Sequence, residues 1–306
     1  MNHANACRMK TLRDLLHDAT LRLQVACVYS PDADAEIIIS TILNISRKEL
    51  KQRLDQTIED ISAIEQAVAQ REQRIPIARI FGQTLFRDIT IKTGEGVFEP
   101  CIETETLIEH LHLALEKQPK TNPRILDIGT GTGCLLLSAL KEIPDATGVG
   151  VDIAGAAVAL AKENAAANGV ADRVEFRVSN WIDQVVPETF DIVLCNPPFV
   201  PSDLIKTLVP EVKLHDPHAS LDGGKDGLRF YRQLTEDFLR VSHEGSIGIL
   251  HVSMTFIEQV KHIFQTAGYQ SVEVCRNYYG VPMGLIVLRD SYCPKVSLMD
   301  RLLRFF

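Results

Sequence analysis

RILDIGTGTG, residues 124–133, is the stretch that decides the fold. It begins as a short apolar run, typical of a buried strand, and ends in glycines. Glycines directly after a strand let the backbone turn sharply into a helix and approach a ligand closely. A dinucleotide-binding loop would place its last glycine at position 134, where this chain has Cys134. The G-x-G-x-G run of Gly129, Gly131 and Gly133 therefore suits a cofactor without a pyrophosphate.

An acidic side chain and a flat ring follow the next two predicted strands. Asp152 ends the second strand, in VGVDI at 149–153, and its carboxylate can accept hydrogen bonds from both hydroxyls of a ribose. The alternative is a tight turn with a surface aspartate. Trp181, in SNW at 179–181, is the only tryptophan. Its ring could cover an adenine or could simply pack in the interior.

NPPF, residues 196–199, follows the fourth predicted strand. The prolines stiffen the chain and remove two N–H donors. The carbonyls of Asn196 and Pro197, with the side-chain oxygen of Asn196, can then hold the hydrogens of an NH2 group and steer its lone pair toward a methyl sulfonium. Phe199 offers a face for a planar group. Methyl transfer needs alignment more than acid or base strength. The motif thus indicates methylation of a planar amide or amine nitrogen; the alternative is a proline-rich loop without chemistry.

Predicted strands and helices alternate from residue 124 onward. We expect strands at 124–128, 149–153, 174–178, 192–195, 247–252, 272–275 and 285–288, and helices at 133–142, 154–168, 228–241 and 255–267. The alternation predicts an α/β fold with a doubly wound parallel sheet covered on both faces. Such a sheet binds its ligands at the carboxyl ends of the strands.

The chain before this region has a different pattern. Residues 1–75 predict a small helical bundle for recognition or support, with Ser30-Pro31 starting one helix and Thr57 with Asp60 starting another as a capping box. Residues 76–103 predict a β-hairpin linker with short strands at 81–82, 85–86 and 89–91. The catalytic domain then covers 104–292 and begins with a helix at 104–116. We expect the tail, 293–306, to pack on the same chain rather than on a partner or membrane.

Composition narrows the class of protein further. The chain has 306 residues, 45% of them hydrophobic and 24% charged, and it has no apolar run long enough for a membrane helix. Its start, MNHANACRMK, lacks the apolar stretch of a secretion signal, so we expect none. Seven scattered cysteines without a CxxC pair argue against disulfides and zinc. His110 and His112 do not share a helix face, so we predict no metal site. A net charge of −8 makes nucleic acid an unlikely main partner. We expect a cytoplasmic monomer.

The order ILDIGTGTG, VGVDI, SNW and NPPF resembles the class I methyltransferases that modify glutamine side-chain amides. Nearly the whole chain is similar to the release-factor glutamine methyltransferase family. Glu103-Thr104-Glu105 before a helix matches that family in particular, as does Asp216-Pro217-His218 with LDGGKDGLRFY at 221–231. The resemblance implies a Rossmann-like catalytic domain after a small helical domain and a hairpin, with S-adenosyl-L-methionine as cofactor.

The resemblance also implies roles for individual residues. The methionine part of the cofactor would lie on the loop of Gly129, Thr130, Gly131, Thr132 and Gly133. Asp152 would hold the ribose and Trp181 would lie near the adenine. Asn196 would touch both cofactor and substrate, and the glutamine pocket would be completed by Pro197, Pro198 and Phe199. The implied partner is a peptide chain release factor, methylated in its Gly-Gly-Gln loop.

Several positions depart from the family pattern. Cys101 and Ile102 replace Arg and Pro, Arg74-Ile75-Pro76 replaces Gly-Glu-Pro, and Phe199 replaces a tyrosine. Residues 252–254 and 278–282 also differ. Three alternatives therefore stay open: an N6-adenine-type methyltransferase acting on nucleic acid, a glutamine methyltransferase acting on a ribosomal protein, and a degenerate homologue that binds release factor or ribosome without turnover.

Overall fold

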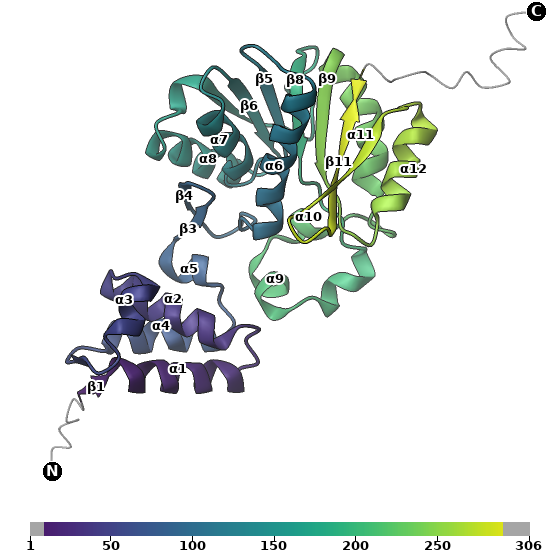
Figure 1. The fold of residues 1–306 in the computed structure, drawn as a ribbon. Helices are drawn as coiled ribbons and strands as arrows, with labels where there is room; N and C mark the ends of the chain where they lie inside the picture. Colours follow the sequence, from purple (N-terminus) through teal and green to yellow (C-terminus); the bar gives the residue numbers. More distant parts are fainter. Residues whose placement is uncertain (1–8, 290–306) are drawn as a thin grey trace, which may run out of the picture. The chain divides into compact units, whose positions relative to one another are not determined.

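Residues 9–289, which the computed structural model describes, fold into two compact units (Figure 1). The first unit extends to Gly82 and includes Pro210–His215 from much later in the chain. The second comprises Gln83–Val209 and the chain from Asp216 onward. The predicted tail at 293–306 lies outside the described residues. Within 9–289, no helix combines the length and apolarity that crossing a membrane requires.

The first unit is built from short helices around an apolar core. Its elements are β1 (Lys10–Thr11), α1 (Leu12–Val25), α2 (Pro31–Leu43), α3 (Arg47–Gln52), β2 (Thr57–Ile58), α4 (Ser62–Glu72) and α5 (Ile77–Phe81). Apolar residues of α1 and α2 face this core, where Leu12, Leu23, Ala35 and Ile38 are fully buried. The predicted helical bundle is therefore present.

Two local predictions in this unit are wrong. Thr57 does not start a helix: it pairs with Thr11 in a short antiparallel ladder. The helix begins instead at Ser62, whose N–H donates to the Asp60 carboxylate at 3.0 Å. Phe81 and Gly82 are not a strand either. Phe81 ends α5, and Gly82 terminates it at φ +68°, the left-handed conformation that glycine adopts without strain.

The helix α9 (Pro210–His215) is held in the first unit by charge. The Glu211 carboxylate pairs with the guanidinium groups of Arg71 at 2.8 Å and Arg74 at 2.6 Å. Arg71 also pairs with Asp34 at 2.7 Å, and its side chain is only 7% exposed. Each charge of this largely buried cluster therefore has an opposite partner, as burial requires.

The second unit contains the predicted doubly wound sheet. Among the described residues it has seven strands in the order β10-β11-β9-β8-β5-β6-β7. Their bounds are β5 (Arg124–Ile128), β6 (Thr147–Asp152), β7 (Val174–Val178), β8 (Phe190–Cys195), β9 (Ser242–His251), β10 (Val272–Arg276) and β11 (Pro282–Leu288). The sequence predicted a parallel sheet, and this is wrong for one strand: β11 runs antiparallel to both β9 and β10. The five residues that connect β10 to β11 are too few for a parallel crossover.

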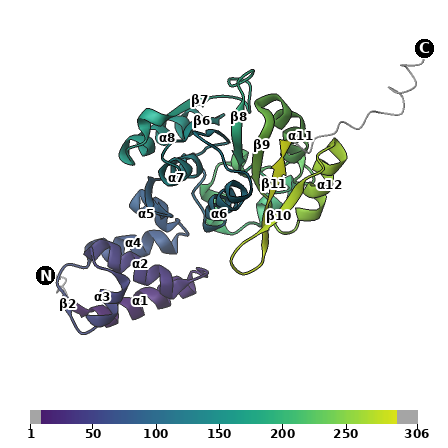
Figure 2. The same ribbon diagram turned by 45° about the horizontal axis from the view of Figure 1, so that its top comes forward.

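Helices cover both faces of this sheet (Figure 2). On one face lie α6 (Ile102–Lys117), α7 (Cys134–Glu142) and α8 (Gly155–Ala167), and on the other α11 (Arg229–Val241) and α12 (Ile257–Ala267). Ile125 packs into the first layer and its neighbour Leu126 into the second, so strand residues are buried on both sides. The shorter helices of this unit are η1 (Ala171–Arg173), η2 (Ser202–Thr207) and α10 (His218–Leu221).

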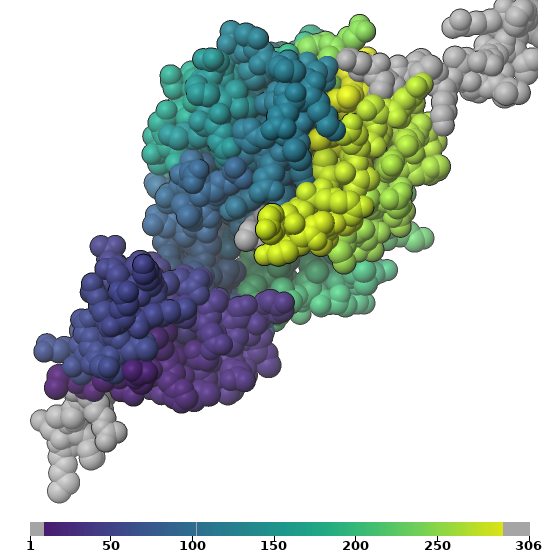
Figure 3. Space-filling view, in the orientation of Figure 1, coloured from purple at the N-terminus to yellow at the C-terminus, as the bar shows by residue number. Residues whose placement is uncertain are grey.

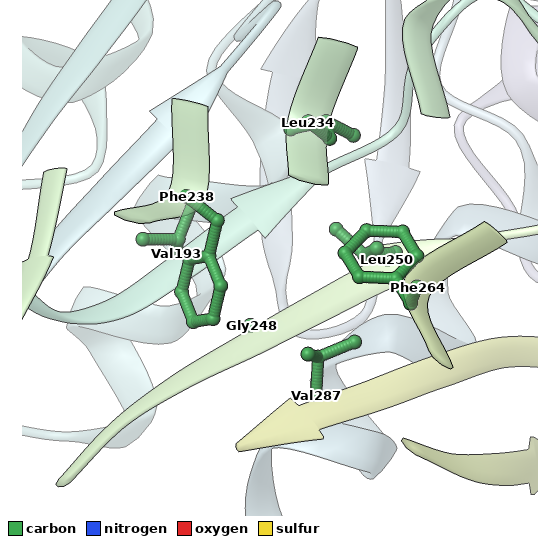
Figure 4. A pocket seen from close by; sticks show the side chains of 7 residues that line it. All are labelled: Val193, Leu234, Phe238, Gly248, Leu250, Phe264 and Val287. Carbon is green, nitrogen blue, oxygen red and sulfur yellow. The ribbon is translucent and has the colours of Figure 1, made fainter. Parts of the chain in front are cut away.

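A small apolar cavity remains between the sheet and α11 and α12. Figure 4 shows its lining: Val193, Leu234, Phe238, Gly248, Leu250, Phe264 and Val287. These residues carry no polar side-chain group, so the cavity can orient no ligand through hydrogen bonds. It is an imperfection of core packing.

The hairpin that joins β10 and β11 stands at the molecular surface (yellow in Figure 3). Its tip carries Tyr278 and Tyr279, whose side chains are 93% and 84% exposed. Because β11 begins beside His251 at the end of β9, the tip projects from the carboxyl edge of the sheet. The departure seen at 278–282 therefore lies at the edge where ligands bind.

Candidate active site

A cavity of ≈ 420 Å³ lies at the carboxyl ends of β5, β6 and β8, within the second unit. This is the size of a typical small-molecule site. Ile128 is in register with both Val151 and Cys195, so the loops that follow these three strands start at the same level. The predicted site residues that line the cavity are Gly129, Thr130, Gly131, Thr132, Asp152, Trp181, Asn196, Pro197, Pro198 and Phe199. Two motifs that are far apart in sequence therefore share one cavity.

The three glycines of the loop have different surroundings. All three have positive φ, at +74°, +55° and +84° for Gly129, Gly131 and Gly133. A Cβ on Gly129 or Gly131 would meet no heavy atom of the described chain within 4 Å, and both residues line the cavity. A Cβ on Gly133, which is outside the lining, would come within 3.2 Å of Ala161 Cβ. The first two glycines keep the cavity open, whereas Gly133 lets α7 pack closely on α8.

Asp152 connects the glycine loop to the next turn. Its Oδ2 accepts a hydrogen bond from Gly131 N–H and its Oδ1 accepts one from Ala154 N–H, both at 2.9 Å. A carboxylate has about four acceptor positions, so each oxygen can accept another hydrogen bond from a ligand. The anchored carboxylate is thus oriented before any ligand arrives.

Trp181 forms one wall of the cavity together with a residue that sequence reasoning missed. The rings of Trp181 and Phe230 stack with centroids 4.9 Å apart and an interplanar angle of 25°. Phe230 lies in the first turn of α11, inside the LRFY part of the 221–231 segment. The stacked pair gives the cavity a flat apolar surface that suits a purine.

The 221–231 segment packs directly against the NPPF motif. Val200 N–H donates to the Leu221 carbonyl at 2.9 Å, and Gly223 N–H donates to the Val200 carbonyl at 2.8 Å. A Cβ on Gly223 would approach Phe199 Cα to 2.7 Å, and one on Gly227 would collide with the Phe199 carbonyl oxygen. Gly223 and Gly227 are therefore needed for this close backbone contact, which fixes the position of NPPF.

Two further buried polar residues support the site. The Thr130 hydroxyl donates to Asp127 Oδ2 at 2.7 Å. Burial raises the pKa of Asp127 to about 7, with a smaller contribution from the charge of Asp152. The fully buried Asn164 donates to the Thr132 carbonyl at 2.9 Å and also bonds the backbone of Lys92 in both directions. The sequence signal for this role was a single asparagine within the alanine-rich helix α8.

The Lys92 contact ties a hairpin to the glycine loop. This hairpin comprises β3 (Gln83–Phe86) and β4 (Ile89–Lys92), which pair antiparallel as predicted for the linker. Val97, Phe98 and Pro100, which follow it, also line the cavity. The chain between the hairpin and α6 is therefore part of the site.

Two histidines and two glutamates of α6 have structural roles. His110 is buried and its Nε2 lies 3.4 Å from the Arg276 carbonyl, whereas His112 pairs with Glu142 at 2.6 Å. Glu103 and Glu105 lie in the first turn of α6, where negative charge suits the helix dipole. Over residues 9–289 no group of metal-binding side chains is found.

Two family models match this chain. One describes the methyltransferase small domain and matches residues 88–221; the other describes the PrmC N-terminal domain and matches residues 14–82. The first match runs from β4 to α10 in the sheet unit, and the second covers most of the helical unit.

Similar proteins include the "Release factor glutamine methyltransferase" of Agrobacterium fabrum, 36% identical over 86% of this chain and 92% of that protein. The protein of the same name from Rhodospirillum rubrum is 34% identical over 92% of this chain and 86% of its own length. Among solved structures, a methyltransferase from Pyrococcus furiosus matches with a TM-score of 0.50 at 19% identity, over 72% of this chain and 98% of that one. That likeness supports the fold alone.

Proposed function

Because this chain belongs to the release factor glutamine methyltransferase family, we propose that it transfers a methyl group from S-adenosylmethionine to a glutamine side-chain amide of a peptide chain release factor. The observation that carries the proposal is the shared cavity of the glycine loop and NPPF. The enzyme acts in the cytoplasm, as a monomer, and its helical first unit serves substrate recognition.

The lining of the cavity fits an adenosyl sulfonium. Gly129 and Gly131 would contact the methionine part, and the Asp152 carboxylate would accept hydrogen bonds from the ribose hydroxyls. The stacked rings of Trp181 and Phe230 would pack against the adenine. The space around the Cβ position of either glycine is open, and both residues line the cavity, which leaves this part of the lining free for the cofactor. When bound, S-adenosylmethionine would supply a methyl group on positively charged sulfur. The C–S bond would break as the N–C bond forms, and the neutral thioether that leaves would need no general acid.

The NPPF residues would position the nucleophile. An amide nitrogen is a weak nucleophile because its lone pair is delocalised into the carbonyl. Asn196 Oδ1 and the carbonyl of Pro197 accept hydrogen bonds from the two amide hydrogens, and Phe199 packs on the planar group. The nitrogen is then aligned with the methyl carbon for in-line attack, which is the main requirement of such a displacement. After transfer the nitrogen loses one proton to water.

Incubation of the purified protein with methyl-labelled S-adenosylmethionine tests this function. Release factor, the same factor with the glutamine of Gly-Gly-Gln replaced by alanine, ribosomal proteins and DNA are offered separately. We expect label only in the release factor that retains the glutamine. Label in DNA alone, in a ribosomal protein alone, or in none of them would overturn the proposal in favour of one of the three alternatives.

A further inference from the structure

The side-chain amide of Asn196 can be used in two orientations, and only one suits the proposed reaction. An amide group ends in one acceptor oxygen and one NH2 donor. To hold the hydrogens of a substrate amide, Asn196 must present its oxygen to the cavity. The flipped side chain would present hydrogens to hydrogens and repel the substrate.

A hydroxyl on α6 fixes this choice. Asn196 Nδ2 donates a hydrogen bond to Thr104 Oγ1 at 3.2 Å. Thr104 is 3% exposed and lines the cavity beside Asn196. Because the nitrogen end of the amide is bound to Thr104, the oxygen end is available to another partner.

The Thr104 hydroxyl has a second partner, Cys101. Cys101 Sγ lies 2.9 Å from Thr104 Oγ1, and the Thr104 backbone N–H donates to the Cys101 carbonyl at 3.0 Å. A hydroxyl has one hydrogen to donate and two lone pairs. Either Cys101 Sγ or Thr104 Oγ1 can be the donor of their contact; because Oγ1 accepts from Asn196 Nδ2, the hydroxyl hydrogen is free to point at the sulfur. Burial raises the pKa of the Cys101 thiol to about 11, so the sulfur stays uncharged at neutral pH.

We infer that Thr104 is a positioning residue, which holds Asn196 with its side-chain oxygen toward the substrate amide. The inference rests on the proposed function, because only a substrate NH2 group makes that orientation necessary. Thr104 acts through Asn196 rather than on the reacting atoms. Its loss should therefore lower kcat more than it weakens cofactor binding.

Three variants separate positioning from packing. Thr104→Val keeps the shape of the side chain and removes the hydroxyl, whereas Thr104→Ser keeps the hydroxyl and removes a methyl group. Thr106→Val is the matched control, because Thr106 lies on the same helix and its hydroxyl donates to the Glu103 carbonyl at 2.6 Å. We measure kcat, KM for release factor, and the Kd of S-adenosylmethionine for each.

We expect Thr104→Val to lower kcat at least ~10-fold, a smaller decrease than removal of a group that contacts the substrate would cause. The Kd of the cofactor should stay within ~2-fold of the wild-type value. Thr104→Ser should keep most of the rate, and Thr106→Val should match the wild type. Wild-type kcat in Thr104→Val would overturn the inference, as would an equal loss in Thr104→Ser or a loss confined to cofactor Kd.

A second readout does not depend on turnover. NMR spectra of protein labelled with 15N at asparagine show the side-chain NH2 signals. The signal that is absent from the spectrum of Asn196→Ala is assigned to Asn196. Thr104→Val should shift it and accelerate the exchange of its hydrogens with water, while Thr106→Val should leave it unchanged. An unmoved signal would sink the inference. If the wild type fails to methylate release factor, the proposed function falls, and this measurement still decides the role of Thr104.

Discussion

The backbone N–H of Gly131 donates a hydrogen bond to Oδ2 of Asp152, with 2.9 Å between nitrogen and oxygen. The two residues lie on neighbouring parts of the cavity lining. Gly131 is the middle of the glycine loop, and Asp152 is the last residue of β6. The contact means that the carboxylate has two tasks. It stabilises the loop that would receive the methionine part, and its remaining lone pairs can accept hydrogen bonds from a ribose.

Asp152→Ala should therefore weaken cofactor binding before it affects the chemical step. Loss of hydrogen bonds to a charged acceptor is worth ~1.5–3 kcal/mol, or roughly 10- to 100-fold in Kd. Titration calorimetry with S-adenosylmethionine measures this directly. Asp172→Ala serves as control, since that carboxylate is exposed in η1 and outside the cavity lining. An unchanged Kd in Asp152→Ala would exclude the proposed ribose contact.

Asn196→Ala should affect the rate rather than binding of the cofactor. Removing one positioned polar group typically costs ~100- to 1000-fold in kcat. Single-turnover methylation of release factor with saturating S-adenosylmethionine gives the rate, and calorimetry gives Kd, which we expect to stay within a few-fold of wild type. A variant that methylates at the wild-type rate would show that NPPF does not hold the amide.

Gly227→Ala should destabilise the protein and slow methylation. Gly227 has φ +76°, and its Cβ would collide with the Phe199 carbonyl oxygen, so NPPF must shift. Gly280→Ala is a close control: its φ is also +76°, but no atom of the described residues lies within 4 Å of its Cβ. Both changes carry the left-handed backbone cost of ~1–2 kcal/mol. Only Gly227→Ala should show an additional decrease in Tm and in kcat. Equal effects in the two variants would refute the close-contact explanation.

Asp127 should make the stability of the protein fall as pH rises. Its pKa of about 7 in the folded protein exceeds the ordinary value of 3.8, so the folded state retains a proton that the unfolded chain has lost. The resulting stabilisation is present below pH 4 and is lost as pH rises toward 7. Asp127→Asn removes this dependence while its amide oxygen can still accept from Thr130.

Differential scanning calorimetry at pH 5.5 and pH 8 checks this. Each pKa unit is worth ~1.4 kcal/mol, and ~1 kcal/mol moves Tm by ~2–4 °C in a domain of this size. The difference in Tm between the two pH values should therefore change by several degrees in Asp127→Asn relative to wild type. Asp145→Asn, an exposed aspartate of the same unit, should behave like wild type. Parallel pH dependence in all three proteins would contradict the buried, protonated Asp127.

Some parts of the fold were predictable from sequence because their causes are local. A glycine run after an apolar strand demands a sharp turn, and β5, at Arg124–Ile128, begins and ends where predicted. The helix periodicity placed α6, α7, α8, α11 and α12 within a few residues. The failures at Thr57 and Phe81 were also local, since short segments near turns suit several conformations equally well.

The sequence by itself determined the layered α/β unit, the loop that can receive a charged nucleoside, and the rigid NPPF segment, because backbone torsions and apolar periodicity are properties of neighbouring residues. Only the tertiary structure decided which partners these pieces meet. The Thr104 hydroxyl reaches Asn196, Phe230 stacks on Trp181, and Glu211 pairs with Arg74 across long stretches of chain. Such contacts depend on the packing of whole elements, a long-range property that spacing along the chain does not encode.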